Sequence, residues 1–223
     1  MFAYPPLNLD EVDYDLYWKN KRGENIGAIS DWQKIRADFI ASKVSGGKFS
    51  FVDIGSGDGS ILNYLKERGS VADATAVDIS QFALERAKEF GFNTLKKDLR
   101  SRSFTEEIPE GDYILMLEIL EHIEHSEIML KKSYEKARKG VFFSFPNTGF
   151  FIHRFRLFFG RFPLQWTLFP GEHLRFWTKR DLYWWLESLG FKNYEIFCYK
   201  GVPVLNKLWP GMFAAGFVVF LKM

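Results

Sequence analysis

The sequence contains a single cysteine, Cys198. One cysteine excludes an internal disulfide bond and a zinc site built from several cysteines. The N-terminal stretch MFAYPPLNLDEVDYD lacks the basic and apolar regions of a secretory signal, so we expect a cytoplasmic protein. No apolar run approaches the roughly 18 to 20 residues that cross a bilayer. The sequence therefore predicts a soluble protein, with peripheral contact as the only membrane association that it allows.

The sequence also has little net charge. Its 30 Lys and Arg against 28 Asp and Glu leave a formal charge of +2. A balance this even gives no electrostatic reason to expect nucleic acid as a partner. A small molecule of low charge remains the expected ligand. The length of 223 residues, with 47% hydrophobic side chains, predicts one α/β domain.

The aromatic content is the unusual feature of the composition. Phe, Trp and Tyr make up 18% of the chain, and the 24 Phe and 7 Trp are concentrated after residue 140. These side chains could form ordinary core, or they could line an apolar site or interface. Within the single domain we expect an irregular arm over residues 1–29, a core over 30–146, an aromatic and Arg-rich insertion over 147–177 and a final helix and hairpin over 178–223.

Strand and helix signals alternate along the chain. Strands are predicted over Phe49–Ile54, Thr75–Val77, Thr94–Leu95, Tyr113–Leu117, Val141–Phe145, Tyr194–Tyr199 and Phe213–Lys222. Helices are predicted from Ser30 to Val44, from Ser60 to Arg68, from Ser80 to Phe90, from Glu127 to Arg138 and from Thr178 to Leu189. The pattern predicts a doubly wound α/β fold: a seven-stranded sheet, mostly parallel with a C-terminal antiparallel hairpin, and helices on both faces.

Three glycines at alternate positions follow the first predicted strand, in FVDIGSGDGS. Glycine there lets a ligand approach the main-chain N–H groups at the start of a helix. The dinucleotide pattern G-x-G-x-x-G fails because Ser60 stands at its third position, and the lysine of a phosphate loop is absent. NAD binding is therefore disfavoured. Asp53 and Asp58 would repel a pyrophosphate and favour a ligand that carries positive charge.

The segment Asp53-Ile54-Gly55-Ser56-Gly57-Asp58-Gly59 resembles the first motif of the class I, Rossmann-like methyltransferases that use S-adenosylmethionine (SAM). The resemblance implies that Asp78 accepts hydrogen bonds from the ribose hydroxyls and that Asp98 contacts the adenine amine. The run from Leu117 to Ile123 resembles the family's fourth motif, at the strand end that faces the methyl group. The implied cofactor-binding residues are Asp53, Gly55, Ser56, Gly57, Gly59, Asp78, Ile79, Asp98, Leu99 and Glu118.

Further along, Ser144-Phe145-Pro146-Asn147 and the Arg-rich stretch through Pro163 are similar to the MetW-like group of methyltransferases. MetW proteins act beside homoserine O-acyltransferase in methionine biosynthesis. The resemblance therefore implies an alternative, a MetW-like regulatory partner without turnover of its own. The chain departs from that group at Ser56, which replaces the usual cysteine of the first motif. The aromatic arm YDLYWKNKRG and the C-terminal LWPGMFAAGF segment are more similar to methyltransferases of polysaccharide and secondary-metabolite clusters.

Methyl transfer to oxygen or nitrogen is helped by a base, and neutral histidine suits that task. His122 follows the fourth predicted strand, and His173 could reach back over the site from the insertion; we expect these two as catalytic residues, with purely structural roles as the alternative. Glu121 could serve as a base or stabilise a helix start. No metal site is expected.

Two segments have open roles. Tyr17, Trp18 and Arg22 of the arm could close over the cofactor, with Arg22 at the methionine carboxylate, or pack on the sheet edge. Residues 149–169 could cover the acceptor site and form a homodimer contact, lie near a membrane or a lipid-linked substrate, or bind RNA. We therefore expect a SAM-dependent methyltransferase acting at an oxygen or nitrogen atom of a small-molecule or glycan acceptor.

Overall fold

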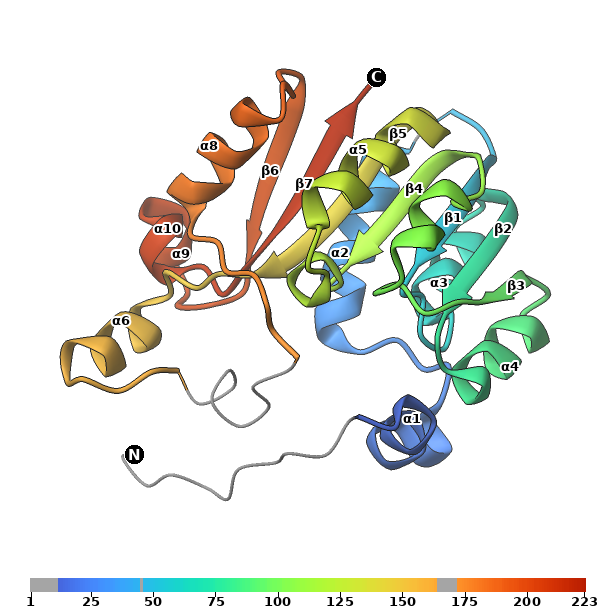
Figure 1. Cartoon of the computed structure of the whole chain (residues 1–223), viewed down its shortest axis with the longest axis horizontal. Coiled ribbons are helices and arrows are strands. Elements are labelled where there is room, and N and C mark those ends of the chain that lie inside the picture. The colour runs from blue at the N-terminus through green and yellow to red at the C-terminus, as the bar shows by residue number, and fades with distance from the viewer. Residues whose placement is uncertain (1–11, 45, 164–171) are drawn as a thin grey trace.

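Seven strands form one sheet in the order β3-β2-β1-β4-β5-β7-β6 (Figure 1). The computed structural model describes residues 12–44, 46–163 and 172–223. The strands are β1 Phe49–Ile54, β2 Val71–Asp78, β3 Asn93–Lys96, β4 Gly111–Leu117, β5 Ala137–Pro146, β6 Tyr194–Tyr199 and β7 Gly216–Lys222. The first five run parallel, and β7 pairs antiparallel with both β5 and β6. The predicted Rossmann-like fold class, including the antiparallel C-terminal strands, is confirmed.

Helices cover both faces of the sheet. On one face α2 Asp31–Lys43, α3 Ser60–Glu67 and α4 Gln81–Glu89 share a core with Phe51 and Phe142. On the other face α5 Ser126–Lys136 and α8 Lys179–Ser188 pack on a second core that includes Phe143 and Phe217. The order of the strands reverses between β1 and β4, and in sheets of this kind a ligand crevice forms outside the carboxyl ends of the strands at such a point.

Local capping signals fixed several helix starts. Ser30 and Thr178 each form a capping box with the residue three positions on, and the Ser80 hydroxyl accepts the N–H of Ala83. These starts agree with the predicted ones. In the described part of the chain the remaining helices are α1 Tyr14–Arg22, α6 Phe151–Phe158, α9 Leu205–Leu208 and α10 Pro210–Phe213, with 3-10 helices η1 Gly23–Asn25, η2 Arg102–Glu106 and η3 Leu120–His122.

Some predicted elements were wrong in detail. The arm is not irregular throughout, because α1 forms with Asp13 as its N-cap. The helix expected over Glu127–Arg138 ends at Lys136, since Ala137 already pairs with Gly111 and belongs to β5. The last strand starts at Gly216 rather than Phe213, which lies in α10. The insertion contains α6, and its residues 164–171 lie outside the described part of the chain.

Among the described helices, none combines the length and the apolar character that a bilayer crossing requires. The predicted soluble character stays a prediction.

Candidate active site

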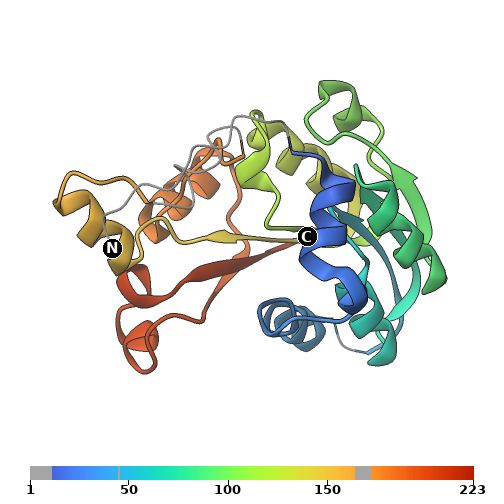
Figure 2. The same cartoon turned by 90° about the horizontal axis from the view of Figure 1, so that it is seen from below.

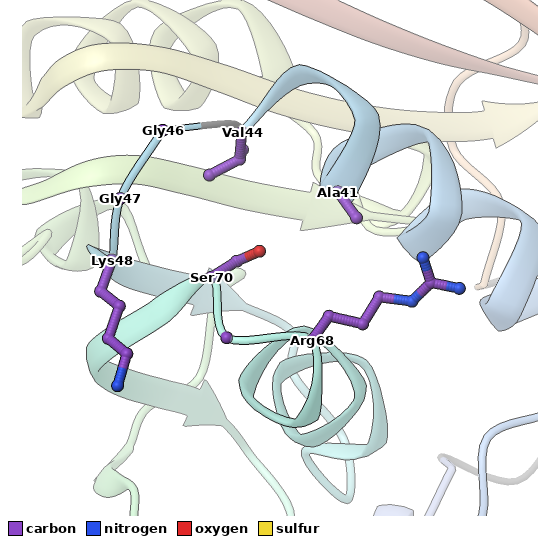
Figure 3. A pocket seen from close by; sticks show the side chains of 8 residues that line it. Ala41, Val44, Gly46, Gly47, Lys48, Arg68 and Ser70 are labelled. Carbon is purple, nitrogen blue, oxygen red and sulfur yellow. The ribbon is translucent and has the colours of Figure 1, made fainter.

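A pocket of about 650 Å³ opens at the carboxyl ends of β1, β2 and β4. Its wall combines residues from the strand ends, from α1 and α2, and from the segment that returns from the insertion at residues 172–173. A second hollow, of about 550 Å³, lies where α2 and α3 end and β1 and β2 begin (Figure 3). Lys48 and Arg68 are its only charged lining residues. Of these two pockets, only the first is lined by carboxylates and imidazoles, so the first pocket is the candidate active site.

The glycine loop forms one wall of this pocket. Gly55, Gly57 and Gly59 all have positive φ, between 53° and 76°. A Cβ on Gly55 would lie 2.2 Å from the side chain of Ile119, and one on Gly57 would lie 2.2 Å from the Trp18 ring. The glycines are thus required by neighbouring protein groups as well as by their backbone conformation.

The N–H groups of the loop are largely used inside the protein. Val77 O accepts two of them, and further acceptors are an Asp78 carboxylate oxygen, Ser56 O and an Asp58 carboxylate oxygen. The donating residues are Gly55, Ser56, Gly57, Gly59 and Ser60. Three of the five donors bond to the end of β2, and the other two bond within the loop. That a ligand lies against these N–H groups stays a prediction. A loop whose donors are already bonded is poorly suited to cradle a pyrophosphate.

Buried carboxylates dominate the chemistry below the loop. Asp78 accepts the N–H groups of Gly57 (2.8 Å) and Ser80 (2.9 Å), one on each oxygen. Burial raises the pKa of Asp78 although those hydrogen bonds oppose the shift. Burial, together with the charge of Asp78, raises the pKa of Asp53 to about 7. A cationic group bound beside these carboxylates would favour their charged forms.

Asp98 and Leu99 line the same pocket beyond β3, and Ile79 follows β2 into its wall. Asp98 is paired through both carboxylate oxygens with Arg100, whose hydrogen bonds lower the pKa of that carboxyl. Apolar and carboxylate groups therefore stand together at this end of the pocket.

The arm closes one side of the pocket. Asp15 accepts hydrogen bonds from the Ser80 hydroxyl (2.6 Å) and the Phe82 N–H (3.0 Å), which holds α1 on the start of α4. Asp58, fully buried, accepts the Gly27 N–H at 2.8 Å and lies 3.5 Å from Arg22 Nε. Figure 2 shows α1, in dark blue, across this end of the sheet. Tyr14, Tyr17, Trp18, Lys21 and Arg22 all line the pocket. Closure of the arm over a bound cofactor stays a prediction.

A partly buried ion pair that the sequence did not reveal also lines the pocket. Arg36 of α2 donates to the Tyr199 hydroxyl at 3.0 Å and lies 3.4 Å from a Glu118 carboxylate oxygen. That oxygen also accepts from Ser144 (2.7 Å) and Tyr199 (3.2 Å). Glu118 adopts φ +58°, an uncommon conformation for a side-chain-bearing residue that occurs mainly where surroundings enforce it. Burial opposes the charge of Arg36, but the neighbouring Glu118 carboxylate raises its pKa above the ordinary value.

One sequence signal could have pointed to Arg36. It stands four residues from both Trp32 and Ile40, on the stripe of helix positions that the apolar spacing assigned to the buried face. A charged residue on such a stripe is buried only with a partner. Neither Glu118 nor Tyr199 could be named as that partner from spacing alone.

The two predicted catalytic histidines meet in the structure. The rings of His122 and His173 are 4.6 Å apart between centroids, in an edge-on arrangement. His122 Nδ1 lies 2.5 Å from Glu172 O, so Nδ1 carries the proton and Nε2 keeps its lone pair. Burial lowers the pKa of His122, and burial with the neighbouring ring lowers the pKa of His173 to about 4. Both rings are therefore neutral near pH 7.

Glu121 holds this pair in place. Its backbone carbonyl accepts the N–H groups of Leu174 (2.8 Å) and Arg175 (3.1 Å), which fixes the returning segment on η3. Its buried side chain lies 4.0 Å from His122 Nε2, and burial with the nearby Glu118 charge raises its pKa well above the usual range. The carboxyl oxygen Oε2 has no hydrogen-bond partner. Among residues 12–44, 46–163 and 172–223, no group of three His, Cys, Asp or Glu side chains is placed to hold a metal ion.

The structure thus gathers most of the predicted site. Ten of the twelve predicted residues line the pocket: Asp53, Gly55, Ser56, Asp78, Ile79, Asp98, Leu99, Glu118, His122 and His173. Gly57 and Gly59 do not line it; Gly57 faces Trp18, and a Cβ on Gly59 would lie 2.9 Å from Ala87 Cβ. Pocket residues that the cofactor resemblance did not supply include Gln33, Arg36 and Glu172.

Comparison with known proteins extends these observations. The model of a family described as methyltransferase domain matches residues 19–196. No curated protein shows significant sequence similarity to the chain. Among solved structures, a SAM dependent methyltransferase from Archaeoglobus fulgidus superposes with a TM-score of 0.65 at 19% identity, over 95% of this chain and 100% of that one.

Two other solved structures share the fold. The magnesium protoporphyrin IX methyltransferase of Synechocystis, with bound SAH (S-adenosylhomocysteine), has a TM-score of 0.62 at 15% identity, over 94% of this chain and 98% of its own. The small RNA methyltransferase HEN1 has a TM-score of 0.64 at 22% identity; the match covers 87% of this chain and 26% of that larger protein. At these identities the likeness is one of fold.

Proposed function

Because the chain belongs to the methyltransferase domain family, we propose that it transfers the methyl group of SAM to an oxygen or nitrogen atom of a small-molecule or sugar-like acceptor. The observation that carries the proposal is the pocket itself. Buried carboxylates from β1 and β2 lie on one side of it, and the neutral His122–His173 pair lies on another.

The residues of the pocket fit SAM. Asp78 has one backbone hydrogen bond on each oxygen and retains lone pairs for ribose hydroxyls. Ile79 and Leu99 supply apolar surface and Asp98 a carboxylate for the adenine end. Asp53 is desolvated and gains from a nearby cation such as an amino-acid ammonium. Arg22 of the arm and Arg36 of α2 carry guanidinium groups that can bind the methionine carboxylate.

SAM supplies an activated methyl group on a sulfonium sulfur, which leaves as a neutral thioether when the acceptor attacks in line. Positioning of the two reactants accounts for much of the rate of such a step. An acceptor hydroxyl or ammonium must also lose a proton. His173 lies in the pocket wall with its ring beside that of His122, so we assign it the role of proton acceptor. His122, fixed by Glu172 O, orients that ring.

Calorimetric titration with SAH tests the cofactor, with NADH as the competing ligand. We expect wild type to bind SAH and not NADH. Asp78→Ala should weaken SAH binding about 10- to 150-fold, the loss expected when a charged group's hydrogen bonds are removed. Asp73→Ala removes an exposed carboxylate from the same strand and should bind as wild type does. Absence of SAH binding by wild type would refute the proposal.

Turnover tests the chemistry. Wild type, His173→Asn and His125→Asn are incubated with methyl-labelled SAM and a panel of hydroxylated and amino acceptors, monosaccharides and one short RNA. Loss of a general base lowers kcat about 100- to 10,000-fold, so His173→Asn should lose turnover at unchanged SAH affinity. His125 bears the matched partly exposed ring outside the pocket, and its variant should retain activity.

The MetW-like alternative remains distinguishable by the same assays. A regulatory partner of an acyltransferase would bind SAH and transfer no methyl group to any acceptor in the panel. Labelling of the short RNA alone would reject the small-molecule acceptor while leaving methyl transfer intact.

A further inference from the structure

An exposed apolar surface lies outside the pocket and has no role in the proposed chemistry. It is centred on α6 and the turn that follows. Its exposed members are Ile152, Phe155, Leu157, Phe158, Phe159 and Phe162. Phe158 is 84% exposed, and Arg156 is the only buried residue of α6. Apolar side chains so exposed on one helix mark a surface that binds something.

The surface continues onto two other segments, and we call the whole the α6 surface. Phe151 of α6 packs on Phe213 at 5.6 Å between ring centroids, and Phe213 contacts Trp209 at 6.2 Å. Trp209 and its neighbour Leu208 are 61% and 76% exposed. In Figure 1, α6, α9 and α10 lie together at one end of the sheet.

The α6 surface also borders the pocket. Phe162, after α6, lies 6.1 Å from the exposed ring of Phe176 between centroids. Phe176 belongs to the returning segment that places His173 in the pocket wall. Apolar exposed side chains therefore extend up to the edge of the candidate active site.

Charge in this part of the chain has one sign. No Asp or Glu occurs between Glu135 and Glu172, and none follows Glu195, although the whole chain has 28 acidic residues. Arg154 and Lys207 are exposed on α6 and α9. The near-zero net charge of the protein conceals this local asymmetry.

The charge pattern selects the partner. Two copies joined through the α6 surface would bring arginine and lysine side chains of like sign together, which opposes self-association. Surfaces that bind at the interface of an anionic bilayer combine exposed Phe, Trp and Leu with Lys and Arg and contain no acidic residues. We propose that the α6 surface docks on an anionic membrane: Phe158, Leu208 and Trp209 insert at the headgroup boundary, and Arg154 and Lys207 contact lipid phosphates.

Co-sedimentation with vesicles tests this inference. Wild-type protein is mixed with vesicles of phosphatidylcholine alone or with phosphatidylglycerol added, and we expect binding to the anionic vesicles only. The double variant Phe158→Ser/Leu208→Ser should bind about tenfold or more weakly, since two large apolar side chains are lost from the interface. The charge variant Arg154→Gln/Lys207→Gln should show a similar loss that high salt reproduces in wild type.

The control is Ile128→Ser on α5, which removes a side chain 48% exposed outside the α6 surface and should leave binding unchanged. All variants should keep the wild-type SAH affinity, which separates membrane binding from the cofactor site. No binding of wild type to anionic vesicles, or equal binding by all variants, would overturn the inference. So would a wild-type dimer in light scattering that Phe158→Ser/Leu208→Ser converts to monomer, because the surface would then join two copies of the chain.

Discussion

Gly57→Ala tests whether position 57 must lack a side chain because the Trp18 ring of the arm packs against it. The added Cβ would lie 2.2 Å from the Trp18 ring, a separation that real Cβ atoms do not show, and it would sit on a backbone with φ +53°. An L-residue in that left-handed conformation costs roughly 1–2 kcal/mol. Overpacking against a ring adds about 1–3 kcal/mol. We therefore expect the free energy of unfolding to fall by about 2–5 kcal/mol, measured by urea denaturation.

Gly69→Ala is the matched control for this substitution. Gly69 has φ +76°, and its added Cβ would meet nothing within 4 Å, so only the conformational cost of about 1–2 kcal/mol applies. The difference between the two variants measures the clash with Trp18.

A double-mutant cycle then identifies the partner. In the Trp18→Ala background the ring is absent, so Gly57→Ala should cost no more than Gly69→Ala does. The reasoning is refuted if Gly57→Ala is as costly without the Trp18 ring as with it. SAH affinity, measured on the same four proteins, reports whether the arm must be in place for the cofactor.

Three further predictions follow from the buried charges. Asp53→Asn should raise the free energy of unfolding at pH 8 by about 1–4 kcal/mol and change it little at pH 4, and denaturation at both pH values checks this. The folded pKa of about 7 exceeds the ordinary 3.8, so the cost of burying Asp53 grows as the pH rises from 3.8 and is complete above about 7. The ring of His173 titrates at about 4 in the folded protein and near 6.5 unfolded, so its contribution to stability should be complete above pH 6.5 and decline as the pH falls toward 4, a slope that His173→Gln should reduce in thermal melts. Tyr199→Phe should destabilise the protein by about 1 kcal/mol while SAH affinity changes less than threefold, whereas Arg36→Met should weaken SAH binding by about tenfold or more; equal affinities for both variants would exclude Arg36 as a cofactor ligand.

Several parts of the site were predictable because their signals are local. Asp78 and Asp98 follow strands at the carboxyl edge of a parallel sheet, so their convergence follows from the topology. The helix starts at Ser30, Ser80 and Thr178 follow from side chains that cap N–H groups three residues away.

Other parts were not predictable because they depend on packing between distant segments. The position of the arm depends on Asp15 and Asp58. Asp15 accepts a hydrogen bond from Ser80, 65 residues further along the chain, and Asp58 accepts one from Gly27, 31 residues before it. In the sequence, nothing distinguishes these two carboxylates from ordinary surface or loop residues.

The sequence by itself determined the doubly wound sheet, the glycine turn after β1 and the acids at the strand ends, because period, turn chemistry and capping act over a few residues. The tertiary structure decided which groups touch. It joined Arg36 to Tyr199 across 163 positions and Glu172 O to His122 across 50. It also set Val77 O and the Asp78 carboxylate as acceptors of the N–H groups of Gly55, Ser56 and Gly57. Such contacts depend on how whole elements pack, since burial leaves a polar group only the partners that packing brings within reach.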